Sequence, residues 1–363
     1  MAPPPVDPTL PLVDHPSRIS ADWLSRVFQG HGIDARVKSF RSSPVGTGQM
    51  ADSYRLTLEY EGPAREAPGS VVVKVPSTDP TSRASGAAGG YGTEVRFYTE
   101  LASDVAIRTP HCYHGAISEA NDEFILVLED LAPAEQGDQI RGCEPSEAEL
   151  ALANLAGLHG SRWCAAQLDD LPWLSRVTPG VAALFAGWLR ERTKDFIARY
   201  ETRLVAGDAE VLSHFAEHVE GWLLGRVERF APLHGDYRLD NLLFGTSEGG
   251  APVATVDWQT LSVAQPGRDV AYFLGNSLVL EERREHEQAL VRAYHAELLR
   301  LGVSGYDFDT CFDDYRHGHF QGPLVTVLGA MGVIQTDRGD EMFMAMCSRS
   351  CQAIRDLDCA SLL

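Results

Sequence analysis

Residues 233–241, Leu-His-Gly-Asp-Tyr-Arg-Leu-Asp-Asn, place a carboxylate and an amide at a spacing that suits phosphoryl transfer. Asp236 could orient an acceptor hydroxyl group, and Asn241 could bind a metal ion beside the phosphates. A second carboxylate, Asp257, follows sixteen residues later within Val-Asp-Trp. Mg²⁺ needs only a few oxygen ligands from the protein, because phosphate and water fill its other positions. The pattern therefore indicates kinase chemistry, with Asp236 as the catalytic residue and Asn241 and Asp257 as metal ligands.

The two candidate metal ligands flank a predicted β-hairpin. Residues 242–244 and 253–256 are short apolar runs, and the turn-forming residues 247–250, Ser-Glu-Gly-Gly, lie between them. Such a hairpin would carry Asn241 at its entrance and Asp257 at its exit, so that one cation could bridge both. The alternative is that these are ordinary turn and strand-end residues, but two independently spaced pieces of the pattern agree.

The pattern His-Gly-Asp-x-x-x-x-Asn with a downstream Val-Asp-Trp resembles that of the aminoglycoside phosphotransferase and choline kinase-like superfamily. Within it, the chain resembles the ecdysteroid-kinase-like group and the kinase domains fused to acyl-CoA dehydrogenases, and residues 234–241 resemble the latter especially well. The resemblance implies an α+β, bilobal protein-kinase-like fold, with a small N-lobe of β-sheet plus helix and a larger, mainly helical C-lobe. It also implies ATP and Mg²⁺ as cofactors.

The resemblance extends to a lysine and a glutamate upstream. Residues 70–75, Ser-Val-Val-Val-Lys-Val, look like the third strand of the kinase sheet, with Lys74 as the phosphate-binding lysine. Residues 94–101 look like the helix whose first residue, Glu94, pairs with that lysine. The alternatives are that Lys74 only covers a strand end with its aliphatic stem and that Glu94 only begins a helix.

Two further segments resemble parts of a nucleotide site. The strand that ends in Glu-Asp-Leu is similar to the kinase hinge, which implies that Glu129 and Leu131 bind the nucleotide. Gly46 and Gly48 lie where a phosphate-binding loop is expected, before a predicted strand. This loop has two glycines in place of the usual three, so by itself it is weak evidence for phosphate binding and could be a plain turn.

Two residues are expected to support the catalytic loop without touching the substrate. His234 should pack against the loop and orient it, and Asp269 should accept hydrogen bonds from it. Trp258 and Gln259 take the place of the Phe-Gly that follows the metal-binding aspartate of protein kinases, and no long activation segment fits before Asp269. Regulation through a phosphorylated activation loop, and a protein as substrate, are therefore not expected.

Hydrophobic patterns indicate the secondary structure around these motifs. Residues 54–60 alternate apolar and polar side chains, which is typical of a half-buried strand, and Ser20 could cap a first helix. Residues 146–149, Ser-Glu-Ala-Glu, form a capping box that predicts a helix closed by Gly160. Residues 82–92 are rich in Gly, Ala and Ser and predict a mobile loop.

The chain as a whole is expected to contain three parts. They are a flexible proline-rich lead over residues 1–16, an N-lobe that binds nucleotide over 17–130, and a C-lobe that carries the catalytic loop, metal ligands and substrate site over 131–363. The first residues lack the basic start and apolar stretch of a signal peptide, so none is expected. The longest apolar run, residues 323–334, is shorter than the ~20 residues that a membrane helix needs, so no membrane span is expected.

The composition favours a cytoplasmic enzyme. The chain has 363 residues, 44% of them hydrophobic, which can bury a sizeable core. Seven cysteines without paired CxxC spacing are typical of reduced thiols in the cytosol. A formal charge of −20 argues against nucleic acid and anionic membranes as partners, because both require a basic patch. The sequence does not indicate an oligomeric state.

The expected partner is a small molecule that offers a hydroxyl group. The C-lobe segments that should surround it are apolar, which favours an acceptor with a sizeable apolar body; the simpler alternative is that these side chains form the core. An aminoglycoside phosphotransferase and a pseudokinase that only binds nucleotide are the other functions considered. The aromatic and methionine side chains concerned are Phe185, Trp188, Tyr200, Trp222, Phe312, Tyr315, Phe320, Met331, Met342, Met344 and Met346.

Overall fold

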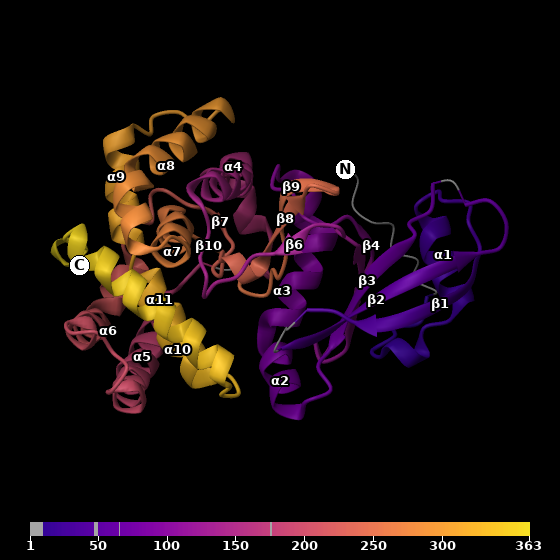
Figure 1. Ribbon diagram of the computed structural model, residues 1–363, viewed down its shortest axis with the longest axis horizontal. Coiled ribbons are helices and arrows are strands. Elements are labelled where there is room, and N and C mark those ends of the chain that lie inside the picture. The colour runs from indigo at the N-terminus through magenta and orange to yellow at the C-terminus, as the bar shows by residue number, and fades with distance from the viewer. Residues whose placement is uncertain (1–9, 47–49, 65, 175) are drawn as a thin grey trace. The chain divides into compact units, whose positions relative to one another are not determined.

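The computed structural model describes residues 10–46, 50–64, 66–174 and 176–363. The chain forms two compact units, a smaller one built on an antiparallel sheet and a larger one that is mainly helical, so the predicted α+β class is confirmed (Figure 1). No helix within the described residues is long and apolar enough to cross a membrane. The first unit comprises Met1–Asp104, Thr109–Ala132 and Val256–Thr260, and the second comprises Val105–Arg108, Pro133–Thr255 and Leu261–Leu363.

The first unit contains a five-stranded antiparallel sheet with the strand order β1-β2-β3-β5-β4. The predicted alternation in residues 54–60 is present, because Leu56 and Leu58 are buried while Thr57 and Glu59 are exposed. The strands are β1 (Val37–Pro44), β2 (Ala51–Tyr60), β3 (Ser70–Pro76), β4 (Cys112–Ile117) and β5 (Phe124–Glu129).

Helix α1 (Ala21–Gly30) lies beside β1 and covers one face of this sheet (Figure 1). Ser20 caps it as predicted, with Oγ accepting a hydrogen bond of 3.1 Å from the backbone nitrogen of Trp23. The indole nitrogen of Trp23 donates to the carbonyl oxygen of Pro11 at 3.1 Å, and Val13 is buried in the same core. Residues 10–16 of the predicted lead therefore pack against the unit, and its residues 1–9 lie outside the described part of the chain.

The prediction of a loop over residues 82–92 is wrong, because this segment is helical on both sides of a kink at Gly89. Asp79 caps it through a 2.8 Å hydrogen bond from the backbone nitrogen of Ser82, and Pro80 occupies the first turn, where its fixed φ suits a helix. These start signals begin the helix, and the glycines that follow interrupt it only at Gly89. The helical elements are α2 (Pro80–Ser85), the π-helical turn Gly86–Gly90, α3 (Tyr91–Arg96), the π-helical turn Phe97–Leu101 and the 3₁₀ turn Ala102–Asp104.

Short strands position the catalytic loop in the second unit. The hairpin of β8 (Leu242–Thr246) and β9 (Gly249–Thr255) is confirmed, and β6 (Glu135–Gln136) extends it. A separate antiparallel pair is formed by β7 (Ala231–Leu233) and β10 (Ser262–Ala264). The catalytic loop and the hairpin lie between these two strands in the sequence.

Helix α4 begins two residues earlier than its predicted capping box. Glu144 is the N-cap, and it forms a reciprocal capping box with Glu147, while the predicted Ser146 lies inside the helix. The proline at position 145 explains the shift, because proline is favoured at the first helical position. The helices of this unit are α4 (Pro145–Ser161), α5 (Pro179–Tyr200), α6 (Asp208–Leu224), α7 (Gly267–Ser277), α8 (Leu280–Arg300), α9 (Phe308–Gly318), α10 (Gln321–Gly332) and α11 (Asp337–Asp356).

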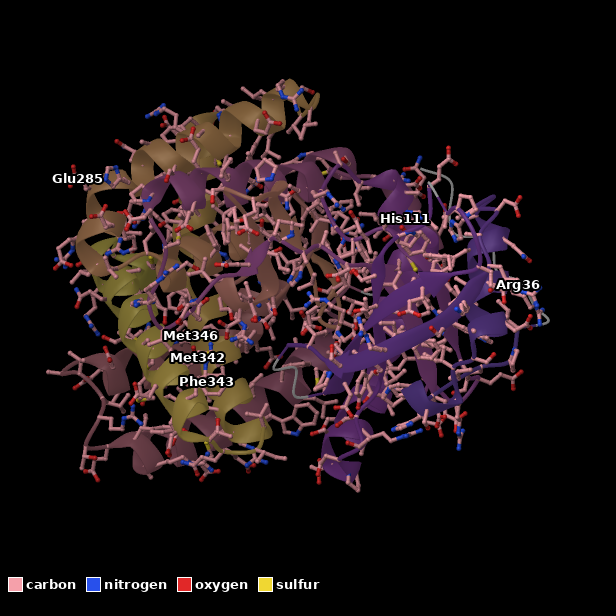
Figure 2. All side chains as sticks on the ribbon, turned by 45° about the vertical axis from the view of Figure 1, so that its right-hand side comes forward. Arg36, His111, Glu285, Met342, Phe343 and Met346 are labelled. Atoms are coloured by element: carbon pink, nitrogen blue, oxygen red, sulfur yellow. The ribbon has the colours of Figure 1, made fainter. Side chains whose placement is uncertain are left out.

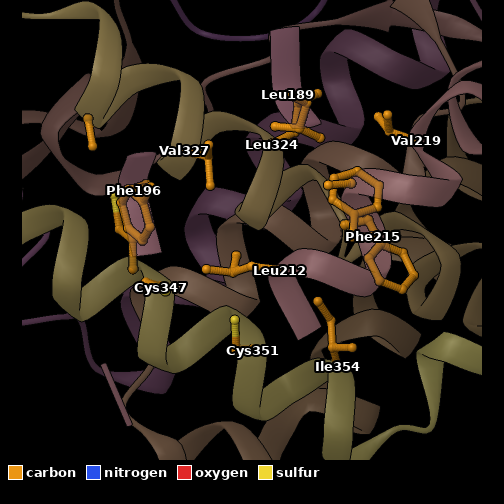
Figure 3. Packing of buried hydrophobic residues seen from close by; sticks show 14 of the residues in the cluster. Leu189, Phe196, Leu212, Phe215, Val219, Leu324, Val327, Cys347, Cys351 and Ile354 are labelled. Atoms are coloured by element: carbon orange, nitrogen blue, oxygen red, sulfur yellow. The ribbon is translucent and has the colours of Figure 1, made fainter. Parts of the chain in front are cut away.

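The core of the second unit lies between α5, α6, α10 and α11 (Figure 3). Cys347 and Cys351 are buried there among apolar side chains such as Phe196 and Leu212, which matches the expectation of small core residues. Helix α7 is buried along its whole length and packs against α9, α10 and α11. A helix held on several sides is a rigid support for polar groups at its end.

Candidate active site

Strand geometry directs Lys74 toward α3. Successive side chains in a strand point to opposite faces, so the burial of Val73 and Val75 against α1 sends Lys74 to the face that α3 covers. There the Nζ of Lys74 lies 2.7 Å from Oε2 of Glu94 and 3.2 Å from Oδ1 of Asp257. The structure therefore brings three of the predicted site residues together within the first unit.

Lys74 is shared by these two carboxylates. Burial favours the neutral amine, but the negative charges of Asp257 and Glu94 outweigh it and raise the pKa of Lys74 above its ordinary value. Burial raises the pKa of Glu94, and the charge of Lys74 acts in the opposite direction. A carboxylate that is only 1% exposed needs such a partner to stay ionised. The lysine is therefore held in place and charged, as a phosphate-binding group must be.

Asp257 adopts an unusual backbone conformation. Its φ is 65°, in the left-handed region that aspartate enters more readily than most residues. Residues held there cost about 1 kcal/mol or more and concentrate at functional sites. The side chain of Asp257 is 36% exposed, in contrast to that of Glu94. A partly exposed carboxylate of this kind can bind a metal ion.

The two residues after Asp257 anchor the helix that carries Glu94. The indole of Trp258 stacks on Phe97, with ring centroids 3.6 Å apart and an interplanar angle of 13°, and donates a 3.1 Å hydrogen bond to Oγ1 of Thr109. The Nε2 of Gln259 donates a 3.2 Å hydrogen bond to Oε2 of Glu94. The sequence showed that these residues replace Phe-Gly, but not that they hold Glu94.

The predicted hinge residues lie at the end of β5. The Oε2 of Glu129 accepts a 2.9 Å hydrogen bond from the backbone nitrogen of His111, and Leu131 is buried. Between them, Asp130 accepts hydrogen bonds of 2.7 and 3.0 Å from the guanidinium group of Arg55, which fixes the chain where it leaves the sheet.

The predicted phosphate loop is only partly within the described residues. Gly46 has a φ of 78°, and a Cβ added there would meet no atom within 4 Å. A glycine is suited to this turn because larger residues avoid that backbone conformation. Gly48 lies in residues 47–49, outside the described part of the chain.

Asp269 holds the start of the catalytic loop. It lies in the first turn of α7 and is fully buried, and its two oxygens accept hydrogen bonds of 2.7 Å from the backbone nitrogen of His234 and 2.9 Å from that of Gly235. The Nε2 of His159 lies 3.3 Å from the same carboxylate. Gly235 has a φ of 83°, so the loop turns sharply at the residue before Asp236.

The side chain of Asp236 is fixed by three donors. Its Oδ1 accepts a 2.6 Å hydrogen bond from the hydroxyl group of Tyr272, and its Oδ2 accepts 3.0 Å hydrogen bonds from Nε of Arg238 and Nδ2 of Asn241. Its backbone nitrogen donates to Nδ1 of His234 at 3.3 Å. The carboxylate is therefore oriented before any substrate binds.

Asn241 is oriented by the same loop. Its Nδ2 also donates to the carbonyl oxygen of Asp236 at 2.8 Å, so the amide oxygen is the atom available as a metal ligand. The next residue, Leu242, pairs with Thr255 in the hairpin, and Asp257 follows two residues after that pair. Both predicted metal ligands thus follow in sequence from one end of the hairpin.

Sequence reasoning did not identify three residues that hold the loop. Arg238 and Tyr272 bind Asp236, and Nε2 of Gln321 donates a 2.9 Å hydrogen bond to the carbonyl oxygen of Gly235. Arg238 lies within the motif, and Tyr272 follows Asp269 by about one helical turn, so both could have been found from their positions. Nothing in the sequence near Gln321 points to the loop.

Most of the apolar side chains expected at the acceptor site belong to the core instead. Trp188 is the clear exception, because it is 57% exposed and lies on α5 with Leu184, which is 62% exposed. Met342 and Met346 lie on α11 and are buried (Figure 2). The other fully buried members of the set are Tyr200, Trp222, Tyr315 and Phe320.

The residues present fit ATP and Mg²⁺. A charged lysine suits phosphate oxygens, and the carboxylate of Asp257 and the amide oxygen of Asn241 are the hard ligands that Mg²⁺ prefers. Among the residues that the structure describes, no group of three or more His, Cys, Asp or Glu side chains could hold a metal ion by itself. Each of these oxygens therefore suits an ion that takes most of its other ligands from phosphate and water.

Comparisons with known proteins identify the family and the fold. The sequence model of the Ecdysteroid kinase-like family matches residues 46–302. No curated protein sequence matches the chain. Among solved structures, the GDP complex of wild-type aminoglycoside 2'-phosphotransferase-IIIa is similar over 92% of this chain and 99% of its own, with a TM-score of 0.52 and 14% identity.

A second similar structure is a putative aminoglycoside phosphotransferase from Ralstonia eutropha JMP134. It has a TM-score of 0.50 and 14% identity, over 92% of this chain and 97% of its own. At this level of identity the two structures show the fold, and they confirm the predicted kinase-like architecture.

Proposed function

The chain belongs to the ecdysteroid kinase-like family, and we propose that it uses ATP and Mg²⁺ to phosphorylate a hydroxyl group on a small molecule with a sizeable apolar body. The observation that carries this proposal is the Asp236 carboxylate. Three donors fix it on a buried loop, yet its side chain keeps 20% exposure, so an acceptor can reach it. This is the group that phosphoryl transfer to an alcohol requires.

Asp236 would orient the acceptor hydroxyl group and take its proton. The acceptor oxygen would form a bond to the γ-phosphorus while the bond from that phosphorus to the bridging oxygen breaks, and ADP would leave. Asp269 would keep the loop rigid during this step through its bonds to His234 and Gly235. Little else is required of the protein except position and charge.

Lys74 would bind the α and β phosphates, with Glu94 setting its direction. Asn241 and Asp257 would hold Mg²⁺, which when bound neutralises charge on the phosphates. Two observations support this assignment. Lys74 is charged and contacts both Glu94 and Asp257. The two metal ligands lie within two residues of Leu242 and Thr255 in sequence, and these pair at one end of the hairpin. We assign the remaining nucleotide contacts to Gly46, Gly48, Glu129 and Leu131.

The charges near Asp236 favour an acceptor that is not a polycation. Arg238 lies 3.0 Å from Oδ2 of Asp236 and 3.5 Å from Oδ2 of Asp240, and Arg338 lies 3.4 Å from Oδ1 of Asp240. Both loop carboxylates are thus neutralised by arginines of the same unit. An aminoglycoside, whose ammonium groups need several uncompensated carboxylates, would find these already paired.

An acceptor with an apolar body is supported by exposed side chains on α5. Leu184 and Trp188 are both more than half exposed, and the ring of Phe185 lies 5.7 Å from that of Trp188. Large apolar groups left in water are a feature of ligand and partner sites. All seven cysteines are free thiols, which supports a reducing location such as the cytoplasm.

The proposal is tested by incubating the purified protein with Mg²⁺ and ATP labelled at the γ-phosphate. Parallel reactions would contain hydrophobic alcohols, hydroxyacyl thioesters, choline and aminoglycosides, and products would be identified by mass spectrometry. We expect transfer to one of the first two classes. A second set of reactions with labelled GTP would establish which nucleotide is used.

Two controls make the result decisive. The Asp236→Asn protein should bind MgATP but transfer nothing, which separates catalysis from contamination. Efficient labelling of an aminoglycoside, with the apolar alcohols untouched, would move the protein to antibiotic phosphorylation. MgATP binding without transfer to water or to any acceptor would favour a pseudokinase.

A further inference from the structure

Gly235 is the residue at which the backbone turns into Asp236, and its own conformation does not fix that turn. Its φ is 83°, and glycine enters both halves of φ space at little cost. The peptide unit between Gly235 and Asp236 could therefore rotate unless neighbouring groups hold it. Such a rotation would redirect the Asp236 side chain, because this peptide unit immediately precedes its Cα atom.

Both polar atoms of this peptide unit have hydrogen-bond partners. Its carbonyl oxygen, which belongs to Gly235, accepts a 2.9 Å hydrogen bond from Nε2 of Gln321. Its N–H group, which belongs to Asp236, donates to Nδ1 of His234 at 3.3 Å. His234 is part of the same loop, whereas Gln321 is the first residue of α10. The bond from Gln321 therefore ties the peptide unit to a helix outside the loop.

Arg268 fixes the direction of the Gln321 amide. Its Nε and Nη2 atoms lie 3.2 and 2.9 Å from Oε1 of Gln321. A guanidinium group can only donate and a backbone carbonyl oxygen can only accept, so Oε1 must face Arg268 and Nε2 must face Gly235. Gln321 and Arg268 are both buried, so water competes little for these bonds.

Arg268 is held in turn by Trp222. The guanidinium carbon of Arg268 lies 3.9 Å from the centroid of the Trp222 ring, where the electron density of the indole face stabilises a cation. The indole nitrogen donates a 2.8 Å hydrogen bond to the carbonyl oxygen of His317, which keeps the ring in place. One chain of contacts thus runs from α6 through α7 and α10 to the catalytic loop.

We propose that Gln321 is a positioning residue for phosphoryl transfer. Its Nε2 sets the rotation of the peptide unit that leads into Asp236 and so aims this carboxylate at the acceptor hydroxyl group. Arg268 keeps the amide in the donating direction. The catalytic part of this inference rests on the proposed function, while the hold on the peptide unit does not. A misplacement of about 1 Å can lower a rate about 100-fold, so a hold of this kind can matter for turnover.

Two substitutions of Gln321 separate this role from packing. Gln321→Met keeps the length of the side chain but removes the donor to Gly235 and the acceptor for Arg268. Gln321→Glu also removes the donor, but its carboxylate still accepts from Arg268 and adds a charge attraction. We expect the melting temperature of Gln321→Met to fall by about 4 °C and that of Gln321→Glu to lie above it.

Turnover should follow the donor and not the stability. We expect kcat to fall about tenfold or more in both Gln321 variants, measured with the best acceptor or as phosphate release to water. The KM for the acceptor and the Kd for MgATP should stay within about twofold of the wild type, because neither ligand loses a contact. Wild-type kcat in Gln321→Glu, or more than about half of it in Gln321→Met, would overturn the proposal.

Tyr306→Phe is the control for a loss of stability alone. Tyr306 is buried in the same unit, and its hydroxyl group donates a 3.1 Å hydrogen bond to Oδ2 of Asp314. The substitution removes this bond and keeps the ring. It should lower the melting temperature and leave kcat unchanged. A fall in kcat equal to that of the Gln321 variants would mean that turnover reports stability, which would also overturn the proposal.

Amide hydrogen exchange at Asp236, followed by NMR, tests the hold on the peptide unit without any acceptor. A peptide unit that can rotate loses its bond to His234 more often, so exchange should be about tenfold faster in both Gln321 variants, relative to amides in the core of α7. Tyr306→Phe should not change this ratio. An unchanged ratio in Gln321→Met would overturn the proposal. If the wild type transfers phosphate to no acceptor, the proposed function fails, and the exchange rates still decide the role of Gln321.

Discussion

Gln259 donates a hydrogen bond of 3.2 Å from Nε2 to Oε2 of Glu94, the same oxygen that lies 2.7 Å from Nζ of Lys74. The position after Trp258 is a glycine in protein kinases. Here it is a buried side chain that ties the helix of Glu94 to the residues after Asp257. The carboxylate of Glu94 is thus held by both Lys74 and Gln259.

Replacing Gln259 with leucine should therefore weaken nucleotide binding. The substitution keeps the volume of the side chain but removes the donor to Glu94, and a hydrogen bond to a charged group is worth about 1.5 kcal/mol. We expect the Kd for MgATP to rise about tenfold in isothermal titration calorimetry. Gln29→Leu, the same change at an exposed position on α1, should leave the Kd unchanged. Equal affinities in the two variants would show that Gln259 does not support Lys74.

Asp236→Asn should abolish transfer and leave MgATP binding nearly intact. The amide keeps the size of the side chain but cannot accept the proton of the acceptor hydroxyl group, so turnover should fall by at least about 100-fold. Steady-state phosphate release and calorimetry would measure the two effects separately. Asp309→Asn, at an exposed carboxylate on α9, is the control. More than about a tenth of wild-type turnover in Asp236→Asn would be incompatible with the proposed role.

The metal prediction concerns Asp257 and Asn241. Asp257→Asn removes the charge, while asparagine tolerates the φ of 65° that alanine would not. It should raise the Mg²⁺ concentration needed for ATP binding by about tenfold or more, whereas Asn241→Ala should mainly lower turnover. Titrations of ATP at several fixed Mg²⁺ concentrations would distinguish them. An unchanged Mg²⁺ requirement in Asp257→Asn would remove that residue from the metal site.

Trp188→Ala tests the apolar acceptor. Because Trp188 is 57% exposed, its loss should hardly change the melting temperature. If the apolar body of the acceptor covers it, the KM for the best hydrophobic alcohol should rise about tenfold, with little change in kcat. Leu299→Ala removes a side chain on α8 that is 46% exposed and should leave the KM unaltered. The same KM in both variants would place the acceptor elsewhere.

Two buried histidines, His317 and His319, should lower the free energy of unfolding of the protein in acid. Burial lowers the pKa of His317 to about 4 and that of His319 to about 3, from an ordinary value of 6.5. Below pH 6.5 the unfolded chain therefore binds protons that the folded chain does not, so their contribution to stability is full above that pH and declines as the pH falls toward 4. Each histidine should lower the free energy of unfolding by about 1.4 kcal/mol per pH unit in this window.

Urea denaturation at pH 7 and pH 5 measures this effect. In His319→Leu the difference between the two pH values should shrink by about 1 to 2 kcal/mol, because one of the two proton-binding groups is gone. His218→Leu removes an exposed histidine of α6 and should leave the difference as it is in the wild type. If His319→Leu kept the full difference, His319 would not be the group responsible.

The local geometry of the candidate catalytic loop could be predicted from sequence because the loop is short. Asp236 and Asn241 are five residues apart, and the hairpin that follows is specified by two apolar runs and a turn, so short-range pattern was sufficient. The N-cap of α1 at Ser20 was predictable for the same reason. The predicted capping box of α4 was two residues too late, because Glu144 and Ser146 could both cap the helix. Pro145 favours the earlier start, since proline suits the first helical position.

Only the tertiary structure decided which side chains hold these residues. Tyr272 and Gln321 reach the catalytic loop from 36 and 86 residues away, and Gln259 reaches Glu94 across 165 residues. Periodicity reports which face of an element is buried but not which buried polar atom meets which, since that depends on how separate elements pack. The same limit applies to the apolar residues of α5 and α11. The sequence shows that these side chains are apolar. Only the packing of the helices decides that Trp188 is exposed to solvent and that Met346 lies in the core.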